Sequence, residues 1–276
     1  MKWTAKDISD DAYFAVGDVF KGMDEAIDRH KDLVISASTL KAQYETNLYF
    51  WLMSGGFQVS EDLQEIFDLG SAFHCHVLES KHFTERYRVS DTIDASDERV
   101  RIGLTEYKFI EQATIEVSKK YPYLMNDENA EIAIFGEIDG VPVKCKIDKL
   151  HITAVGGRFT HVEIIDLKGV WFDPFKQKKS ASKDRWELRK KLSSTGYDLQ
   201  AYFYKKLVEA WLESIGQSCP VTFSLVVASK ETTKVQKFRV GDEMLLTGEE
   251  KFNSVWSHVV DFVTHGKSAL VDEEVL

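Results

Sequence analysis

The chain of 276 residues contains only three cysteines, and their number and spacing exclude two kinds of site. Cys75, Cys145 and Cys219 lie far apart and are odd in number, so they imply no disulfide framework. An iron–sulfur cluster of the common type is held by four cysteine thiolates, which three cysteines cannot supply. We therefore expect neither a disulfide scaffold nor an iron–sulfur cluster.

Long hydrophobic runs are also missing from the chain. No apolar stretch approaches the roughly 18 residues of a membrane-spanning helix, and residues 1–7 lack a signal-peptide core. The remaining composition, 43% hydrophobic and 12% aromatic with four prolines, is that of an ordinary globular protein. Because there is no internal repeat and no linker-like tract, we expect a single domain over residues 1–276. The lack of a membrane-spanning run and of a signal-peptide core leads us to expect a cytosolic protein without membrane contact.

Positive charge is scarce overall and concentrated in one segment. The chain has 35 Lys and Arg against 45 Asp and Glu, and the formal net charge of −10 argues against a general nucleic-acid coat protein. Residues 176–191 are nevertheless strongly basic, through Lys176, Lys178, Lys179, Lys183, Arg185, Arg189, Lys190 and Lys191. Such a segment can follow the phosphates of a nucleic acid, and a solvated surface loop is the alternative interpretation.

Residues 162–168 carry the strongest chemical signal. The run at residues 162–167 is rich in apolar and β-branched side chains and predicts a strand buried on both faces. Side chains alternate along a strand, so Asp166 and Lys168 share a face. A carboxylate and an ammonium group near the end of a buried strand are costly to desolvate unless they pair, bind a metal or take part in chemistry.

A hairpin that precedes this strand adds a second carboxylate. Asp139-Gly140 stands between two alternating runs, which is the pattern of a two-residue hairpin turn. In the return arm, residues 141–148, apolar and polar side chains alternate, and Asp148 lies on the polar face. If this arm pairs with the next strand, Asp148, Asp166 and Lys168 converge at one end of the sheet. Two carboxylates can hold one or two Mg²⁺ ions and a lysine can orient water, a set suited to phosphodiester hydrolysis.

Two predicted helices add further polar candidates. A helix over residues 60–79 carries His74, which is either a satisfied core group or a functional residue. A helix over residues 197–214 places Gln200 and Tyr204 on one face, together with Tyr197. Core packing explains the apolar residues of this helix but not Gln200, which indicates contact with a catalytic residue or a substrate phosphate.

Shorter patterns predict the remaining elements. Residues 7–30 have the character of an acidic, partly amphipathic helix, and an aromatic helix follows after residues 36–39. The predicted strands cover residues 83–90, 131–138, 221–228 and 233–240, and two further helices cover residues 99–120 and 243–264.

Four motifs in this order resemble those of the PD-(D/E)XK nuclease superfamily, and most closely the branch of exonuclease VIII (RecE) and related phage recombination exonucleases. They are the Gly-x-Ala-x-His helix at residues 70–79, Lys146-Ile147-Asp148, Ile165-Asp166-Leu167-Lys168, and the Gln-x-x-x-Tyr helix with Gln200 and Tyr204. The resemblance covers about residues 36–230, with a nuclease core at about 60–230. In one departure, Gly169 follows Lys168 where the family usually has threonine.

The resemblance implies an α/β fold with a PD-(D/E)XK, restriction-endonuclease-like core. In that core a central mixed β-sheet is flanked by helices, and an N-terminal helical elaboration is added. The resemblance also implies that Asp148 and Asp166 are metal ligands, together with His74 and Glu131, the acidic residue at the start of the first core strand. A surface charge is the alternative interpretation of Glu131. The implied cofactor is Mg²⁺, which Mn²⁺ can replace.

The remaining site residues take supporting roles in the same resemblance. Lys168 would position the attacking water and help to deprotonate it, and Gln200 and Tyr204 would support the site. The basic side chains Lys176, Lys178, Lys179, Lys183, Arg185 and Arg189 would contact DNA.

By resemblance, the chain would be an exodeoxyribonuclease that degrades double-stranded DNA from its ends, 5′ to 3′, in a bacterial or phage-infected cell. The exposed 3′ strand would pass to a single-strand annealing protein. Ring-shaped homo-oligomers give processivity in this family, so an oligomer is expected by analogy. Two other interpretations stay open: a different PD-(D/E)XK nuclease, such as an endonuclease or a single-strand-specific repair nuclease, and a non-catalytic nuclease-fold protein that binds DNA or protein.

Overall fold

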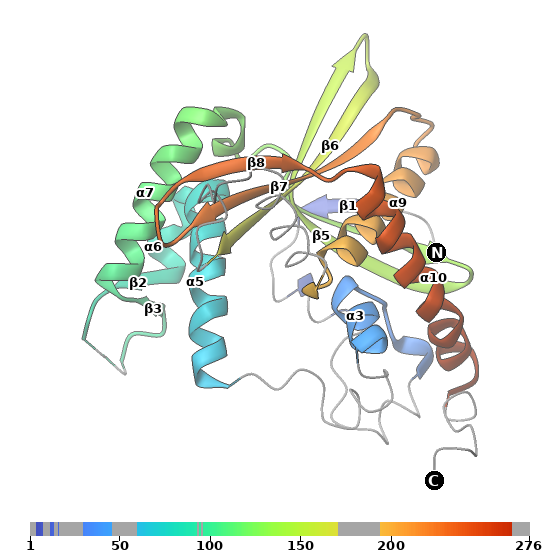
Figure 1. Ribbon diagram of the computed structural model, residues 1–276, viewed down its shortest axis with the longest axis horizontal. Helices are drawn as coiled ribbons and strands as arrows, with labels where there is room; N and C mark the ends of the chain where they lie inside the picture. Colours follow the sequence, from blue (N-terminus) through green and yellow to red (C-terminus); the bar gives the residue numbers. More distant parts are fainter. Residues whose placement is uncertain are drawn as a thin grey trace, which may run out of the picture.

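The computed structural model describes residues 4–7, 12, 13, 16, 30–45, 60–92, 94, 96–170 and 194–266 (Figure 1). The helical segments are η1 (His30–Asp32), α3 (Ala37–Glu45), α5 (Glu61–Leu78), η2 (Ser80–His82), α6 (Phe83–Arg86), α7 (Leu104–Lys120), η3 (Pro122–Met125), α9 (Tyr197–Ser214) and α10 (Asp242–His265). The strands are β1 (Thr4–Asp7), β2 (Tyr87–Val89), β3 (Val100–Ile102), β4 (Ala130–Ile138), β5 (Val141–Val155), β6 (Arg158–Val170), β7 (Val221–Ser229) and β8 (Val235–Arg239).

A six-stranded sheet in the order β1-β4-β5-β6-β7-β8 forms the centre of the molecule. The strands β4, β5 and β6 form an antiparallel meander, whereas β7 runs parallel to β6. A parallel pair requires a crossover connection, and α9 lies within the connection between these two strands. The fold is therefore α/β with a mixed central sheet and flanking helices, which confirms the fold class predicted from the sequence.

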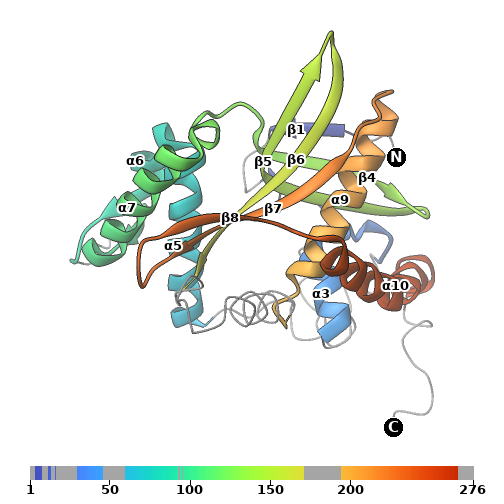
Figure 2. The same ribbon diagram turned by 45° about the horizontal axis from the view of Figure 1, so that its top comes forward.

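Helices cover the two faces of this sheet and bury separate hydrophobic cores (Figure 2). Along β6, Ile164 joins the core formed with α9 and α10, while Ile165 and Leu167 join the core formed with α5 and α7. This alternation follows from the two-residue period of a strand. All three side chains are fully buried, as predicted for a strand covered on both faces.

The β4–β5 turn fixes the register of the meander. Asp139 and Gly140 have φ values of 51° and 78°, the positive angles that a type I′ hairpin turn requires at both central residues. Ile138 and Val141 pair directly on either side of the turn. The alternation that the sequence predicted for the return arm is present, because Val143 and Cys145 lie in the same core as Val141.

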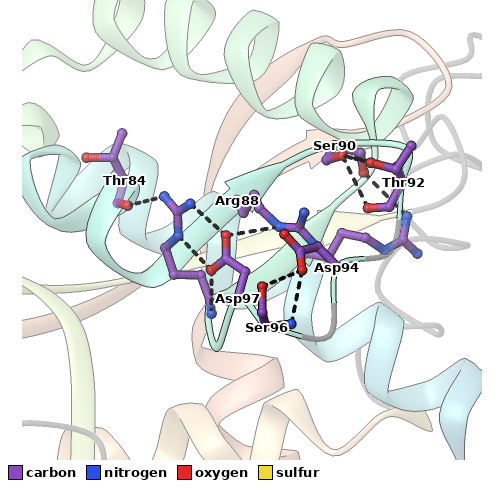
Figure 3. A network of polar contacts seen from close by, with 9 residues as sticks. Thr84, Arg88, Ser90, Thr92, Asp94, Ser96 and Asp97 are labelled. Carbon is purple, nitrogen blue, oxygen red and sulfur yellow. Dashed lines mark hydrogen bonds and ion pairs between the residues drawn. The ribbon is translucent and has the colours of Figure 1, made fainter.

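The structure departs from the predicted elements around two short strands. The strand predicted over residues 83–90 is present only as β2, because residues 83–86 form the short helix α6. The helix expected over residues 99–120 begins only at Leu104, because residues 100–102 form β3, which pairs in parallel with β2. Asp97 joins these segments through ion pairs of 3.3 Å with Arg88 and 2.7 Å with Arg99 (Figure 3). A strand of three residues is too short to show a period in the sequence, which explains the error.

The N-terminal helical elaboration is visible only in part. Asp7 belongs to strand β1 and not to a helix, and most of the helix expected over residues 7–30 falls outside the described residues. The helix expected after residues 36–39 is present as α3, whose first turn is capped by Ser36 Oγ accepting from the backbone N–H of Thr39. Of the helices in the described part of the chain, none has the length and apolar character that spanning a bilayer requires.

Candidate active site

The candidate site lies where β5 and β6 separate. The β5–β6 ladder ends at the pair Lys149–Ile165, whereas β6 remains paired with β7 as far as Val170. Leu167 therefore has no backbone partner on its β5 side. Two side chains take the place of the backbone pairing with β5. Oδ2 of Asp148 accepts the Leu167 N–H at 2.7 Å, and Nε2 of His74 lies 2.8 Å from the Leu167 carbonyl oxygen.

These contacts place His74 and Asp148 against each other. His74 comes from α5, and its Nδ1 atom lies 3.4 Å from Oδ2 of Asp148. Glu131, at the start of β4, completes a group in which one ligand atom from each residue lies within 4.8 Å of the others. The structure thus brings together three of the four residues predicted as metal ligands.

Electrostatics in this group favour a bound cation. Burial, reinforced by the charge of Asp148, raises the pKa of Glu131 to about 7, and burial with the charge of Asp166 raises the pKa of Asp148 to about 7. Burial and the positive charge of Lys168 lower the pKa of His74, so its ring is neutral near pH 7. Each carboxylate is therefore only partly ionised near pH 7, and a cation bound nearby would favour the ionised forms.

The tautomer of His74 supports the same conclusion. Since Nε2 faces a carbonyl oxygen, which can only accept, the neutral ring carries its proton on Nε2. The unprotonated Nδ1 then points a lone pair at the carboxylate of Asp148 at 3.4 Å. Two such acceptors face each other favourably only when a proton or a cation lies between them. One imidazole and two carboxylates are an acceptable donor set for a divalent cation such as Mn²⁺ or Mg²⁺, so the residues present fit a metal.

The backbone of Glu131 is in an uncommon conformation. Its φ of 52° lies in the left-handed region, which a glutamate rarely occupies and which occurs preferentially at functional sites. The β4–β5 ladder pairs Ala130 with Lys149 and Ile132 with Ile147, but it omits the position between them. Oε2 of Glu131 contacts Nζ of Lys146 at 2.8 Å. Glu131 is therefore a largely buried group beside His74 and Asp148, unlike the surface charge of the alternative interpretation, and its role as a metal ligand stays a prediction.

Asp166 and Lys168 form the second half of the site. Asp166 is buried, with 3% of its surface exposed, and its Oδ2 lies 2.8 Å from Nζ of Lys168. Its Oδ1 accepts a hydrogen bond of 2.9 Å from Nε2 of Gln200 on α9. The predicted shared face of Asp166 and Lys168 and the predicted inward direction of Gln200 are both confirmed. Oδ2 has the ion pair with Lys168 but no hydrogen-bond partner among the described residues, and the role of Asp166 as a metal ligand stays a prediction.

Lys168 carries a firmly held positive charge. Burial alone would lower its pKa, but the carboxylate of Asp166, with smaller contributions from Tyr197 and Asp148, outweighs burial and leaves the pKa above its usual value. The ammonium group also lies 4.9 Å from the centroid of the Tyr197 ring. A charged lysine can donate hydrogen bonds but cannot accept a proton, which favours the positioning part of its predicted role over the deprotonating part.

The other predicted residues are placed less completely. Tyr204 packs in the core beneath the site, with its ring centroid 6.4 Å from that of Phe223, and burial raises its pKa well above the usual value. The six predicted DNA contacts, Lys176, Lys178, Lys179, Lys183, Arg185 and Arg189, all lie outside the described residues. Their contact with DNA stays a prediction.

Lys146 is a part of the site that the sequence analysis did not assign. It contacts Glu131 and shares the polar face of β5 with Asp148. The alternation of residues 141–148 placed Lys146 on that face, and its contact with Glu131 follows from the adjacent register pair Ala133–Lys146. The sequence indicates this register only through the predicted Asp139-Gly140 turn, which aligns the two strands.

Three features define a PD-(D/E)XK nuclease fold: the β4–β6 meander, the parallel strand β7 beyond it, and the Asp-x-Lys pair where β5 and β6 separate. Residues 36–270 match the model of the family described as "PDDEXK-like domain of unknown function (DUF3799)", and the chain belongs to this family. Comparison with curated proteins gave no match.

Two solved structures resemble the fold to different degrees. The crystal structure of a candidate exonuclease from Eubacterium rectale matches with a TM-score of 0.56 and 15% identity, over 97% of this chain and 92% of that chain. At this identity the likeness shows a shared fold. A second structure, that of SSO0001, matches at 12% identity over 54% of this chain and 68% of that chain, and its TM-score of 0.23 carries no argument.

Proposed function

We propose that the chain is a metal-dependent exodeoxyribonuclease that degrades double-stranded DNA from its ends, with 5′ to 3′ polarity, and leaves 3′ single strands for an annealing protein. The observation that carries the proposal is the position of the His74, Glu131 and Asp148 group beside the Asp166–Lys168 pair. A cation site next to a fixed ammonium group is an arrangement suited to phosphodiester hydrolysis. The candidate exonuclease with a similar fold supports the same class of activity.

The residues of the chain divide this reaction between them. His74, Glu131 and Asp148 would hold Mg²⁺ or Mn²⁺, with Asp166 as the fourth proposed ligand. When bound, the metal would polarise the scissile phosphate and lower the pKa of a water molecule. The ammonium group of Lys168 would donate to a phosphate oxygen or to the attacking water and so fix the line of attack.

Supporting contacts keep Lys168 and its partner in place. Gln200 fixes the orientation of Asp166 through its hydrogen bond to Oδ1, and Asp166 in turn holds Lys168. The basic segment at residues 176–191 follows β6 in the chain and would bind the phosphates that flank the cleaved bond. A ring-shaped oligomer would keep the enzyme on its substrate, as proposed by analogy.

Digestion of three DNA forms tests the proposal. End-labelled linear duplex, covalently closed circular duplex and single-stranded DNA are incubated with Mg²⁺, with Mn²⁺ and with a chelator, in parallel with the variant Lys168→Ala. The proposal expects metal-dependent loss of linear duplex alone, starting from 5′ ends and abolished in the variant. Cutting of the circle would identify an endonuclease. Binding of duplex without any cutting would show a non-catalytic nuclease-fold protein.

A further inference from the structure

The first turn of α9 contacts both members of the Asp166–Lys168 pair. Gln200 reaches Oδ1 of Asp166 at 2.9 Å, and the ring of Tyr197 lies under the ammonium group of Lys168, 4.9 Å from Nζ to the ring centroid. Residues three apart on a helix lie side by side, and residues two apart on a strand share a face. One turn of α9 therefore matches the spacing of the two strand residues and holds both.

The local sequence allows this arrangement. Gly196 immediately precedes Tyr197 and has a φ of 75°, a conformation that side-chain-bearing residues rarely adopt. A Cβ atom at Gly196 would also lie 3.2 Å from Cδ of Lys41 on α3. The chain can thus pass close to α3 and turn into α9 with Tyr197 as the first helical residue, directed at the end of β6.

The contacts of Lys168 show what the ring contributes. An ammonium group has three N–H donors. Asp166 Oδ2 lies on one side of Nζ at 2.8 Å, and the Tyr197 ring covers another side. The lysine side chain retains 18% exposure, so it is not completely closed off from solvent. An aromatic ring attracts a cation without taking a proton or bonding strongly enough to compete with a phosphate.

We propose that Tyr197 is a positioning residue for Lys168: its ring face, and not its hydroxyl group, holds the ammonium group in the orientation in which one donor faces the scissile phosphate. The functional meaning of this inference rests on the proposed nuclease reaction, whereas the contact itself can be measured without that reaction. Tyr197 touches neither DNA nor metal in this role and acts only through Lys168.

A double-mutant cycle on the metal-free protein tests the contact. The unfolding equilibrium constants of the wild type, Tyr197→Leu, Lys168→Met and the double variant are measured in urea. A cation–π contact of this burial predicts a coupling of about 3- to 30-fold between the two positions. The same cycle with Tyr197→Phe in place of Tyr197→Leu should give no measurable coupling, because phenylalanine keeps the ring and therefore the contact. The matched control is Tyr202, on the same helix, whose hydroxyl group contacts Glu249 at 3.2 Å; its cycle with Lys168 should give no coupling.

Single-turnover cleavage of linear duplex then tests the functional role. Tyr197→Phe should cleave within about twofold of the wild-type rate, and Tyr197→Leu should be slower by about 3- to 30-fold with an unchanged Kd for DNA. Zero coupling in the unfolding cycle would overturn the proposed contact, and a normal rate for Tyr197→Leu would overturn its role in the reaction. Absence of cleavage by the wild type would instead contradict the nuclease proposal, and the unfolding cycle would still decide the contact.

Discussion

The Nδ1 atom of His74 and the Oδ2 atom of Asp148 face each other at 3.4 Å, although they come from a helix and a strand 74 positions apart in the chain. Both side chains also bind the backbone of Leu167, one at its carbonyl group and one at its N–H group. His74 and Asp148 therefore occupy the place where β5 and β6 separate, and they are also two of the proposed metal ligands. A cation site at a splayed strand pair is the feature on which the proposed function depends.

The charge of this site should make the stability of the metal-free protein depend on pH. Asp148 and Glu131 have folded-state pKa values of about 7, above those of an unfolded chain, so the folded state binds more protons between about pH 4 and pH 7. The free energy of unfolding should therefore fall as pH rises through this window. Excess Mn²⁺ should restore stability at pH 8, by about 2.7 kcal/mol at a concentration of 100 Kd. Urea unfolding at several pH values measures both effects.

Asp148→Asn is the matching variant for this prediction. Without metal, it should lose less stability between about pH 4 and pH 7 than the wild type, because one of the two carboxylates is gone. Asp127→Asn, an exposed carboxylate paired with Lys81, is the control and should behave as the wild type in this window. An identical pH dependence in Asp148→Asn and the wild type would contradict the electrostatic account of the site.

Gln200→Leu should weaken both the fold and the reaction. The substitution leaves Oδ1 of buried Asp166 without its amide donor, which costs about 1–3 kcal/mol of unfolding free energy. Loss of a supporting contact to a site residue typically lowers activity by about 10- to 100-fold. Gln217→Leu serves as the control, since Gln217 also makes one side-chain hydrogen bond, in which its Oε1 accepts from the Phe159 N–H, but lies beyond the far end of α9. It should lower stability and leave the cleavage rate unchanged; equal rates for the two variants would refute a role for Gln200.

The α9–α10 contact should depend on a buried ion pair. Asp198 is fully buried and lies 2.8 Å from Nζ of Lys251. Lys251→Met removes the ammonium partner of that buried carboxylate, which also accepts the Leu199 N–H, and should cost about 3–5 kcal/mol in urea unfolding, more than the double variant with Asp198→Asn. The exposed pair Lys205–Glu209 on the same helix is the comparison, where Lys205→Met should cost less than about 1 kcal/mol. Equal costs for the two lysines would show that burial does not govern these pairs.

The basic segment should determine how DNA binding responds to salt. Replacing Lys176, Lys178 and Lys179 by glutamine should weaken duplex binding and reduce the slope of log K against log salt concentration by about 2 to 3. Lys119→Gln, which removes a lysine paired with Glu116 on α7, should leave the slope unchanged. Fluorescence anisotropy over a salt series provides the measurement. An unaltered slope in the triple variant would favour the solvated-loop interpretation of this segment.

Sequence patterns predicted the parts of the fold that have long periods or specific turns. The helix at residues 197–214 has the predicted bounds, and the Asp139-Gly140 turn has the predicted conformation. The strand β3 was missed because three residues show no period, and β1 because its pairing with β4 is long-range. Sequence alone placed Asp166 and Lys168 on one face, since alternation is a local property.

Contacts between distant elements could not be read from the sequence. The Lys168–Tyr197 contact depends on how α9 packs against β6. The left-handed backbone of Glu131 is set by this tertiary context and opposes the local preference of the residue. Such local conflicts with the global fold are expected at functional sites.

A joint titration of metal binding and DNA cleavage tests the central claim most directly. Mn²⁺ and Mg²⁺ are titrated by calorimetry into wild type and Asp148→Asn, and cleavage of linear duplex is measured over the same concentrations. We predict that binding and cleavage share one midpoint in the wild type, that Mn²⁺ binds more tightly than Mg²⁺ because an imidazole is among the ligands, and that the variant loses at least about tenfold in both. Cleavage in the presence of a chelator, or unchanged metal binding by Asp148→Asn, would contradict the assignment of this site.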